Sequence, residues 1–466
     1  MDVRLKFLGG AQSVTGSKYL LELDKKKLLV DCGLFQGLKE LRLRNWDEFP
    51  MDATTIDAIV LTHAHIDHSG YLPRIVNEGF NGPIYCTEAT ASLLEILLMD
   101  AAKLQEEEAE FAQHKGYSKH NPPLALFNTE DAKKALEMVV PIPYQKPVNV
   151  LESVTATFFD AGHILGSAIV SLHIQGETQQ KKIVFSGDLG RYNQPLLKDP
   201  YAIHDADVLF IESTYGDRDN VAEDIEGQLA SIVKTAFNND GCLLIPSFAV
   251  GRTQLLLYYF HRLLTTNQIP ACDVYIDSPM AISATNLHKI HRDDHKLSIG
   301  RGEHESIFDY PRFKYFRTQD SSMSINSIEK NAIIISASGM CTGGRIMHHL
   351  FNRLSRKNDT LLFVGFQAEG TRGRKILDGE PTSRIYGIEV PVKCHVEHIN
   401  GLSAHADRGE LMRWAGQFEE APKMTFVVHG ELKSAHHLSL KLKEELQWPN
   451  VMIPRYLESF ELFTGI

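Results

Sequence analysis

Up to residue 207, short apolar runs alternate with turns that contain glycine. Runs of this kind, bounded by turn-forming residues, predict short strands. Apolar residues at helical spacing with a glutamate-rich outer face predict one long helix, and a second helix is expected to begin with Thr129 as its cap. Strands accompanied by outer helices indicate a sandwiched α/β architecture. The strands are expected at 3–8, 18–23, 27–30, 58–61, 154–159, 168–174 and 182–185, and the helices at 88–111 and 129–138.

After residue 207 the pattern changes to buried strands that alternate with helices. This alternation favours a parallel sheet covered on both faces, and we interpret the block as a second domain. The chain then returns to its first pattern, with a strand at 423–428 and a helix at 434–446, so the second domain is expected to be inserted into the first. The strands of the block are expected at 208–211, 242–246, 274–277, 332–336 and 360–364, and its helices at 222–237 and 253–264.

The size and composition of the chain agree with two domains. Its 466 residues exceed what one hydrophobic core normally serves, and 43% hydrophobic with 23% charged residues is typical of soluble globular proteins. The six cysteines form no CxxC pair, which favours a reducing cytoplasm over a disulfide framework. Neither a signal peptide nor a segment of transmembrane length is found, so no membrane partner is expected.

The net charge of −11 argues mildly against a polyanionic partner, although two bound divalent ions would offset it locally. Between residues 344 and 376, however, seven basic residues face only two acidic ones. This excess could attract a phosphate backbone; an ordinary solvated helix face is the alternative. The basic residues are Arg345, Arg353, Arg356, Lys357, Arg372, Arg374 and Lys375, and the acidic ones are Asp359 and Glu369.

A cluster of potential metal ligands follows the predicted strand at 58–61. His63, His65, Asp67 and His68 lie within six positions, on the loop at the carboxyl end of that strand. Imidazole and carboxylate ligands suit zinc, and more of them than one tetrahedral ion needs suggests two ions. Packing alone gives no reason to crowd imidazoles, because like charges and desolvation both cost free energy. Metal-dependent hydrolysis is therefore the first hypothesis.

Three more candidate ligands stand at other strand ends beside glycine. Asp31 follows the run 28–30, His163 lies in a turn between Gly162 and Gly166, and Asp188 follows Gly187. Each alone is more often a cap or a turn former than a ligand. Their weight comes from combination with the first cluster.

In that combination the chain resembles the metallo-β-lactamase superfamily. Asp31, the His63-x-His65-x-Asp67-His68 cluster, His163 and Asp188 match the superfamily's motifs one to four in order. The resemblance implies an αββα sandwich and two zinc ions. One ion would be held by His63, His65 and His163, the other by Asp67 and His68, with Asp188 as the bridge. Asp31 would orient ligands or water by hydrogen bonds.

Three further segments resemble motifs A, B and C of the β-CASP nucleases, which include the RNA-cleaving subunit of the eukaryotic pre-mRNA 3′-processing complex and its bacterial relatives. They contain Glu212, His405 and His429, and the segments 246–254 and 336–340 are also typical of this family. The resemblance covers essentially the whole chain and implies an inserted β-CASP domain at 217–403, with the metallo-β-lactamase domain at 1–216 and 404–466. Because Met1 and Ile466 lie close to the ends of that domain, we expect the minimal two-domain form.

The resemblance also implies roles in catalysis. His429 would complete the second zinc site; this position is commonly Val in the DNA-repair branch, so His429 favours RNA as the substrate. A zinc-bridging hydroxide would attack phosphorus, with Asp31 and Asp67 holding the centre, and His405, backed by Glu212, would protonate the departing oxygen. Manganese or iron could replace zinc in the cell.

The expected function is hydrolysis of single-stranded RNA, with internal and terminal cleavage both left open. Arg252, Arg345 and the Ser338-Gly339 turn are candidates for phosphate contact, although Arg252 could equally be structural and Gly339 could simply form a turn. A DNA exonuclease, a hydrolase of small esters or thioesters and a non-catalytic RNA-binding subunit are the alternatives. A homodimer is also left open.

Overall fold

The computed structural model describes residues 1–115, 124–219, 224–298, 306–365 and 367–466. The chain divides into two compact units. Unit 1 comprises Met1–Asp219 and His405–Ile466, and unit 2 comprises Asn220–Ala404, where the sequence predicts an insert over 217–403. Within the described ranges, no helix is long and apolar enough to cross a membrane.

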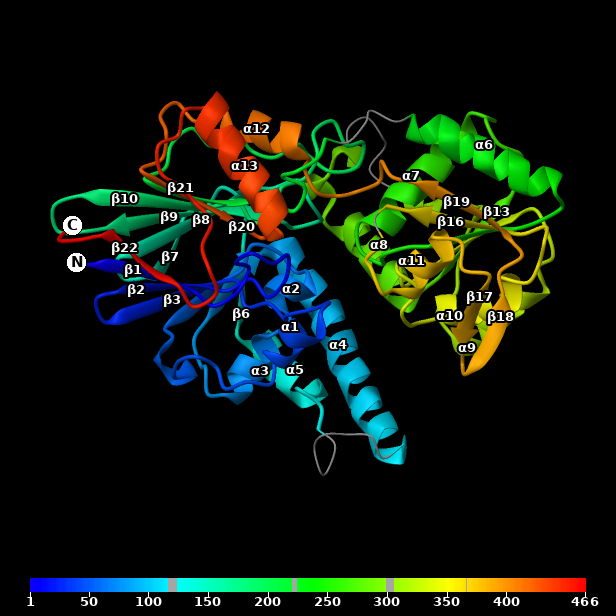
Figure 1. Ribbon diagram of the computed structural model, residues 1–466, viewed down its shortest axis with the longest axis horizontal. Helices are drawn as coiled ribbons and strands as arrows, with labels where there is room; N and C mark the ends of the chain where they lie inside the picture. The colour runs from blue at the N-terminus through cyan, green and yellow to red at the C-terminus, as the bar shows by residue number, and fades with distance from the viewer. Residues whose placement is uncertain (116–123, 220–223, 299–305, 366) are drawn as a thin grey trace. The chain divides into compact units, whose positions relative to one another are not determined.

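Two seven-stranded sheets form the centre of unit 1 (Figure 1). In the first strand, Val3, Leu5 and Phe7 are buried while the residues between them face outward, the period of two that a half-buried strand requires. The first sheet contains, in the order β22-β1-β2-β3-β4-β5-β6, the strands β22 (Ser459–Phe463), β1 (Val3–Phe7), β2 (Tyr19–Leu23), β3 (Lys26–Val30), β4 (Ala58–Val60), β5 (Ile84–Thr87) and β6 (Val139–Ile142). The second contains, in the order β21-β20-β11-β10-β9-β8-β7, the strands β21 (Val451–Met452), β20 (Met424–Val428), β11 (Val208–Glu212), β10 (Gln180–Phe185), β9 (Ala168–Gln175), β8 (Val154–Asp160) and β7 (Val148–Leu151).

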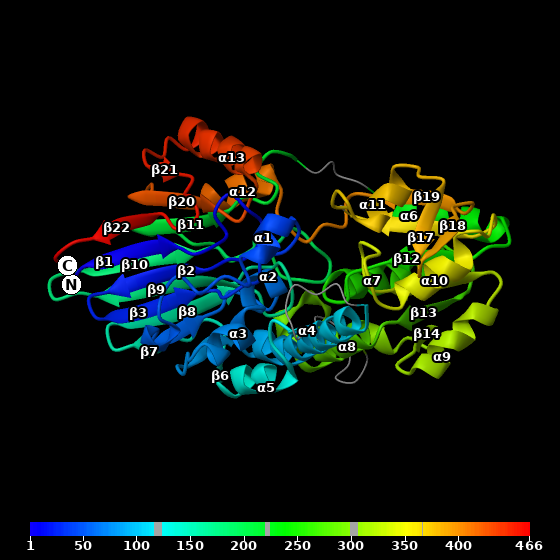
Figure 2. The same cartoon turned by 60° about the horizontal axis from the view of Figure 1, so that its bottom comes forward.

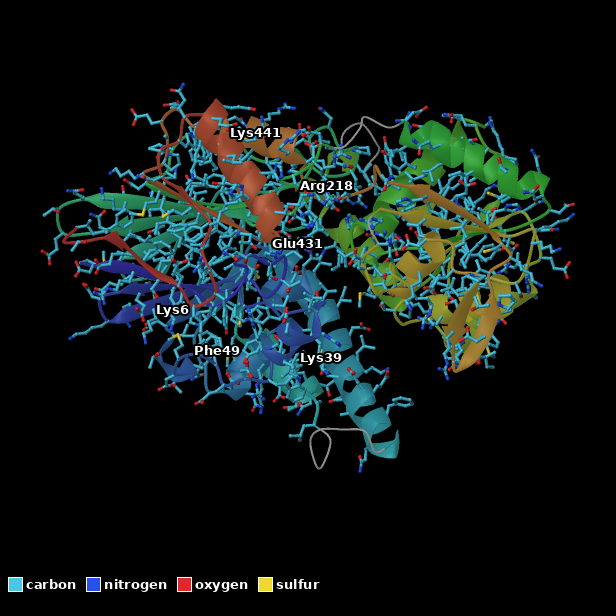
Figure 3. All side chains as sticks on the ribbon, viewed as in Figure 1. Lys6, Lys39, Phe49, Arg218, Glu431 and Lys441 are labelled. Atoms are coloured by element: carbon cyan, nitrogen blue, oxygen red, sulfur yellow. The ribbon has the colours of Figure 1, made fainter. Side chains whose placement is uncertain are left out.

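The two sheets enclose one apolar core and carry helices on their outer faces (Figures 1 and 2). Fully burying each phenylalanine of this core, such as Phe185 or Phe210, stabilises the fold by roughly 1.5–3 kcal/mol. The second sheet is covered by two helices whose apolar side includes Leu411, Trp414 and Leu438, while polar side chains such as Lys441 lie at the surface (Figure 3). The predicted αββα sandwich is thus confirmed. The helices of unit 1 are α1 (Lys39–Leu43), α2 (Ile66–Ser69), α3 (Leu72–Asn77), α4 (Glu88–Lys115), α5 (Thr129–Glu137), α12 (Arg408–Ala415) and α13 (Leu432–Glu445).

Two details of unit 1 differ from the sequence-based expectations. The cap of α5 is Asn128, whose side chain accepts from the backbone of Glu130 and Asp131, whereas Thr129 donates to Glu106 of α4. The strand expected at 208–211 is β11, which pairs in parallel with β10 and β20 in unit 1. The change of pattern after residue 207 assigns this strand to the second domain, whereas the resemblance, with the first domain at 1–216, assigns it to the first. A continuous apolar run predicts a strand that is buried on both faces, and such a strand would have the same pattern in the sheets of either domain.

Unit 2 is built on a six-stranded parallel sheet flanked by helices, as predicted. Its core joins strand residues such as Leu244 and Ile334 to Leu350 and Ile376 of two helices. In the order β14-β13-β15-β12-β16-β19, the strands are β14 (Phe313–Tyr315), β13 (Asp273–Asp277), β15 (Ala332–Ser336), β12 (Leu243–Pro246), β16 (Thr360–Val364) and β19 (His395–Ile399); a separate hairpin contains β17 (Thr382–Ile385) and β18 (Ile388–Pro391). The helices are α6 (Ile225–Asn238), α7 (Arg252–Thr265), α8 (Pro279–Ile290), α9 (Gln319–Ser324), α10 (Ile346–Arg353) and α11 (Arg372–Leu377); the expected start of the first at residue 222 lies outside the described residues.

Much of the basic excess between residues 344 and 376 is used inside unit 2. The buried Arg353 guanidinium pairs with Asp359 and donates to two backbone carbonyls. Arg372 donates to the carbonyl of Cys341, and Arg374 pairs with Asp378. These three side chains therefore have structural partners, which weakens the case for a phosphate-binding stripe along this stretch.

Candidate metal centre

Loops and the short helix α2 at the carboxyl ends of several strands of unit 1 supply the candidate ligands. Asp67 and His68, which the sequence places on a loop, lie in α2. The strands β3 and β4 are parallel neighbours in one sheet, and β10, β11 and β20 are parallel neighbours in the other. Their carboxyl ends consequently meet at one edge of the sandwich. The donors that follow these ends are Asp31 after β3, the cluster 63–68 after β4, His163 after β8, Asp188 after β10, Glu212 at the end of β11 and His429 after β20.

A first group of donors gathers three imidazoles and one carboxylate. His65 Nδ1 lies 3.1 Å from His63 Nε2 and 3.2 Å from His163 Nε2. Asp188 Oδ2 lies 3.4 Å from His63 Nε2 and 3.6 Å from His163 Nε2. These four residues form a cluster capable of holding one metal ion.

A second group lies beside the first. His68 Nε2 is 3.1 Å from His429 Nε2, and Asp67 Oδ2 is 3.4 Å from the same atom of His429. Asp188 Oδ1 is 3.3 Å from His68 Nε2 and 3.2 Å from His429 Nδ1. One carboxylate oxygen of Asp188 therefore faces each group, as a bridging ligand must.

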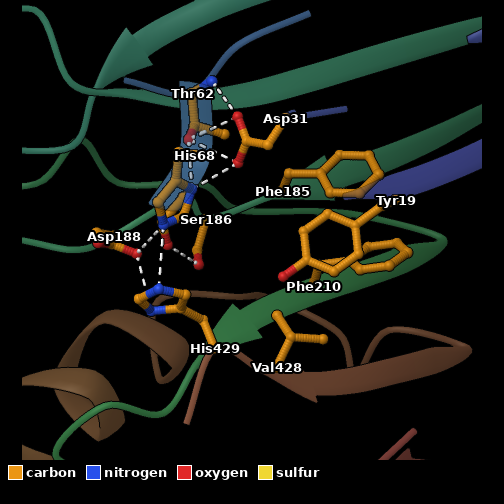
Figure 4. Close-up of a pocket in the computed structure, with 11 residues that line it drawn as sticks. Tyr19, Asp31, Thr62, His68, Phe185, Ser186, Asp188, Phe210, Val428 and His429 are labelled. Carbon is orange, nitrogen blue, oxygen red and sulfur yellow. Dashed lines mark hydrogen bonds and ion pairs between the residues drawn. The ribbon is translucent and has the colours of Figure 1, made fainter. Parts of the chain in front are cut away.

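Hydrogen bonds on the far side of three imidazoles indicate which nitrogen each turns toward the centre. Asp31 Oδ2 accepts a 2.7 Å hydrogen bond from His68 Nδ1, as Figure 4 shows. The Thr62 hydroxyl donates to Asp31, so it can accept from His63 Nδ1 at 3.0 Å. In the neutral form of each ring, the opposite nitrogen, Nε2, carries the lone pair that a cation would take, so a cation would displace the Nε2 proton of His68.

His429 is oriented in the same way by a threonine. The Thr214 hydroxyl donates to the His429 carbonyl at 3.1 Å and lies 3.2 Å from His429 Nδ1, from which it can accept. The Nε2 atom is then the one that faces His68 and Asp67. All three orienting contacts come from side chains of the protein itself.

The donor set fits divalent metal ions. In a tetrahedral zinc site with bonds of about 2.0–2.1 Å, donor atoms stand roughly 3.3 Å apart, which matches the separations of 3.1–3.6 Å between ring nitrogens and Asp188 Oδ2 in the first group. Asp188 Oδ1 is buried and accepts no hydrogen bond, although a lone carboxylate oxygen normally needs a donor or a cation when buried. Both observations point to cations as the missing partners of these atoms.

Two of the site residues have backbone conformations that side chains rarely adopt. Asp31 has φ of 59° and His429 has φ of 47°, in the left-handed region. The Asp31 N–H donates to Val60 and the His429 N–H donates to Gly10, so regular hydrogen bonds hold both residues there. Strain of this kind persists where the surrounding structure fixes it, and it is common at functional sites.

Two glycines allow the ligand loops to approach one another. A β-carbon on Gly33 would lie 1.6 Å from the Asp67 carbonyl oxygen, and one on Gly190 would lie 1.9 Å from the Gly162 carbonyl oxygen. Gly33 thus brings the Asp31 loop against Asp67 and His68, and Gly190 brings the Asp188 loop against His163. No other residue type fits at either position.

Burial and mutual charge shift the pKa values of the donors in opposite directions. Burial, together with the nearby His68, lowers the pKa of His63 to about 3, and burial with His405 lowers that of His163 well below its ordinary value. For His68, burial acts in the same sense, but Asp188 and Asp31 outweigh it and hold the pKa well above 6.5. Neutral His63 and His163 are the forms that ligate a metal.

His405 and Glu212 lie next to the first group of donors. His405 Nδ1 is 3.3 Å from Glu212 Oε1 and 4.0 Å from Asp188 Oδ2. The fully buried Glu212 also accepts from the backbone N–H groups of Leu189 and Thr214. Although burial opposes it, the Glu212 carboxylate raises the pKa of His405 to about 9, so this imidazole is held in its protonated form.

Comparisons with known proteins show the family of this chain. A model of the metallo-β-lactamase superfamily matches residues 14–223, a Beta-Casp domain model matches 253–376, and a model of the Zn-dependent metallo-hydrolase RNA specificity domain matches 389–454. Ribonuclease TTHA0252 of Thermus thermophilus is 34% identical over 92% of this chain and 93% of its own length. This chain belongs to the β-CASP group of the metallo-β-lactamase superfamily. The predicted resemblance is confirmed, and the family together with the His/Asp cluster implies that the chain binds divalent metal.

Other relatives of this β-CASP protein carry different names. The transcription termination factor FttA of Methanosarcina mazei is 30% identical over 96% of this chain and 69% of its own length. An RNase J-like protein of Methanocaldococcus jannaschii is 29% identical over 98% of both chains. A crystal structure of a protein of unknown function from Enterococcus faecalis V583 has the same fold, with a TM-score of 0.57 at 13% identity over 99% of this chain and 100% of that chain.

The remaining predicted site residues lie in unit 2 of the β-CASP protein. Arg345 donates to Asp277 Oδ1 at 2.7 Å and to two backbone carbonyls. Arg252 donates to the carbonyls of Val364 and Leu402. Ser338 accepts from the Thr342 N–H within the turn that contains Gly339. Both guanidinium groups therefore have structural roles, and phosphate contact by these four residues stays a prediction.

Sequence reasoning missed two residues of the site. The Thr62 hydroxyl donates to Asp31 and lies 3.0 Å from His63 Nδ1. The Thr214 hydroxyl lies 3.2 Å from His429 Nδ1. Both stand beside residues that were singled out, since Thr62 precedes His63 and Thr214 lies two positions after Glu212. The signal that could have found them is the need of each ligating imidazole for a partner on its other nitrogen.

Proposed function

We propose that this β-CASP protein is a zinc-dependent ribonuclease that hydrolyses phosphodiester bonds of single-stranded RNA. The observation that carries the proposal is the convergence of two donor groups on the two oxygens of Asp188. Two metal ions of this arrangement would provide a nucleophile from water at neutral pH and neutralise charge on the phosphoryl oxygens. The relative named Ribonuclease TTHA0252, at 34% identity, supports RNA as the substrate.

The ligand assignment follows the geometry. We assign His63, His65 and His163 to one zinc ion, Asp67, His68 and His429 to the other, and Asp188 to both. Asp31 and the two threonines keep the imidazoles aimed at the ions, so the chain spends no free energy on reorienting them during the reaction. Manganese would fit the same nitrogen and oxygen donors, and metal analysis of the protein as isolated distinguishes the two.

His405 is the proposed proton donor to the departing oxygen. Its Nδ1 is fixed toward Glu212, which leaves Nε2 as the atom able to face a substrate. Glu212 keeps its own place through two backbone N–H groups. A carboxylate behind an imidazole both orients the ring and stabilises its protonated form, which are the two requirements for a general acid.

The cytoplasm is the proposed location. All six cysteines are free, and five of them are buried. Thiols that remain unpaired are typical of proteins from a reducing compartment. A homodimer remains a prediction, which light scattering of the purified protein tests.

The function is tested with end-labelled substrates. Purified protein should cleave single-stranded RNA in preference to matched single-stranded DNA and to a chromogenic ester. His65→Ala should abolish zinc binding and RNA cleavage together, whereas His436→Ala, at an exposed position of α13, should change neither. Turnover of the ester alone would mean a small-molecule hydrolase, and preference for DNA would mean a DNA nuclease. Tight RNA binding without cleavage by the zinc-loaded protein would mean a non-catalytic subunit.

A further inference from the structure

The backbone segment that follows Asp188 is bonded to three other parts of the site. Its Leu189 N–H donates to Glu212 Oε1 at 2.7 Å, and its Gly190 N–H donates to the Ala161 carbonyl beside the His163 loop at 2.8 Å. The Leu189 carbonyl accepts from the Ala406 N–H at 2.8 Å, and Gly190 forms a β-bridge with His405. Asp188 and His405, the proposed bridging ligand and proton donor, therefore lie on two backbone segments that are hydrogen-bonded to each other.

One carboxylate on α12 accepts hydrogen bonds from both of these backbone segments. Glu410 Oε2 accepts from the Asp407 N–H at 3.0 Å, two residues after His405. The same carboxylate accepts from the Tyr192 N–H through Oε1 at 3.1 Å and from Arg191 Nε through Oε2 at 3.3 Å. Tyr192 lies four residues after Asp188, so Glu410 connects the two segments that present the bridging ligand and His405.

Capping of the helix alone does not require these contacts. Another helix of unit 1 with the same capping box is α5, in which Asp131 accepts from the Asn128 N–H at 3.0 Å, three residues away. In α12 the equivalent acid also reaches a residue 218 positions away. Arg413 of the same helix lies over the ring of Tyr192, and Gln417, just after the helix, donates to its hydroxyl. Loss of Glu410 would therefore loosen the junction without releasing the helix.

We propose that Glu410 is a positioning residue that fixes His405 relative to Asp188 and influences the reaction through His405. The proposal rests on the function proposed above. There the oxygen of water bonds to phosphorus and releases a proton to solvent, the phosphorus–oxygen bond to the leaving group breaks with its electron pair on that oxygen, and the proton of His405 passes to the released oxygen and is replaced from solvent. A proton donor must stay within hydrogen-bond reach of that oxygen. A displacement of about 1 Å can cost roughly a hundredfold in rate.

Leaving-group dependence provides the first test. RNA releases an alkoxide that needs a proton, whereas bis(p-nitrophenyl) phosphate releases a nitrophenolate that departs without one. Glu410→Ala should lower kcat on RNA by roughly tenfold or more, with KM and zinc content unchanged, and should lower kcat on the nitrophenyl ester less than about twofold. Glu410→Gln, which keeps one acceptor oxygen, should fall between. Equal losses on both substrates would show that Glu410 supports the metals instead, and the proposal would be overturned.

A double-mutant cycle provides the second test. If Glu410 acts through His405, Glu410→Ala should cost little once His405→Ala is already present, so the two losses should not multiply. Asp131→Ala is the matched control, because it removes the corresponding cap of α5, which packs against α3 and α4. The control should keep full activity. Fully multiplicative losses would overturn the proposal.

A third measurement does not depend on activity. With ¹³C-labelled histidine, the His405 ring resonance, assigned by its absence in His405→Ala, should shift in zinc-loaded Glu410→Ala and stay in place in Asp131→Ala. If RNA is not cleaved at all but this resonance shifts, the proposed function fails and the positioning role of Glu410 stands. An unchanged resonance in Glu410→Ala would refute the positioning role even in an active ribonuclease.

Discussion

Asp31 Oδ2 and His68 Nδ1 are joined by a buried hydrogen bond of 2.7 Å. The carboxylate also accepts from the Thr62 N–H and hydroxyl, so it is held by the strand β4 end while it holds the imidazole. His68 Nε2 is left facing His429 and Asp188. Asp31, which belongs to neither group of donors, therefore controls the direction of a donor atom in the second group.

Removal of Asp31 should weaken one metal site. Asp31→Ala leaves His68 free to rotate, and loss of such an orienting carboxylate typically costs 10–100-fold in metal affinity. Titration of the metal-free protein with zinc against a chromogenic chelator should show that loss. Asp57→Ala removes an acid that pairs with Lys26 and accepts from the Lys27 backbone N–H at the opposite end of the β3–β4 pair, and should leave affinity unchanged. Unchanged affinity in Asp31→Ala would contradict the orienting role.

The two acids of the centre should differ in the number of ions that they hold. Asp188 presents one oxygen to each donor group, whereas Asp67 belongs to the second group alone. Asp188→Ala should lower the zinc content by close to two ions per chain and Asp67→Ala by about one. Elemental analysis after dialysis measures the content. The same loss in both variants would mean that Asp188 does not bridge.

Loss of the imidazole of His405 should reduce turnover without loss of metal. His405→Ala removes the proposed proton donor, for which a reduction of kcat by roughly 10²–10⁴ is expected. Steady-state cleavage of labelled RNA and elemental analysis of the same sample test this together. If zinc content falls in parallel with kcat, His405 is a ligand and its role has been misassigned.

A methyl group at Gly33 should disrupt the centre. The β-carbon in Gly33→Ala would overlap the Asp67 carbonyl oxygen and lie 2.6 Å from the backbone nitrogen of His68. The loop must move, and we expect a loss of about 3 kcal/mol in the free energy of unfolding together with loss of zinc. Gly343→Ala, where nothing lies within 4 Å of the added carbon, is the control. Urea unfolding measures the free energy of unfolding of both variants, and an equal value in the two would contradict the prediction.

Stability in mild acid should depend on a buried histidine of unit 2. Burial lowers the pKa of His288 from 6.5 to about 4, so the folded chain keeps the ring neutral while the unfolded chain protonates it. This group therefore contributes stability that is present above pH 6.5 and is lost as the pH falls toward 4. Between pH 7 and pH 5 the loss amounts to about 2 kcal/mol.

Replacement of this ring should remove that part of the acid sensitivity. In His288→Leu the drop in unfolding free energy from pH 7 to pH 5, measured by urea titration, should be smaller than in the unaltered protein by about that amount. Groups of the metal centre titrate equally in both proteins and cancel in the comparison. Equal drops in the two proteins would show that His288 is protonated without cost.

Local patterns in the sequence determined most of the secondary structure of unit 1 and the identity of the donors. The strand that ends at Val30 and the strand that ends at Val60 are short apolar runs, and each is followed directly by a potential ligand. The sequence could locate these strands because a short continuous apolar run is a local signal of a buried strand. The grouping of His63, His65 and His163 came from the resemblance to a family, which carries tertiary information that no single pattern contains.

Tertiary structure alone decided what depends on residues distant in sequence. The membership of β11 in the second sheet, the role of Thr62 between Asp31 and His63, and the reach of Glu410 to Tyr192 are all contacts between separate segments. The guanidinium groups of Arg252 and Arg345, which the sequence offered for phosphate contact, donate to carbonyls and a carboxylate of unit 2. Sequence periodicity records which side of an element is buried, whereas the partner of a buried polar group is fixed only when the elements pack, because an unpaired one would cost free energy.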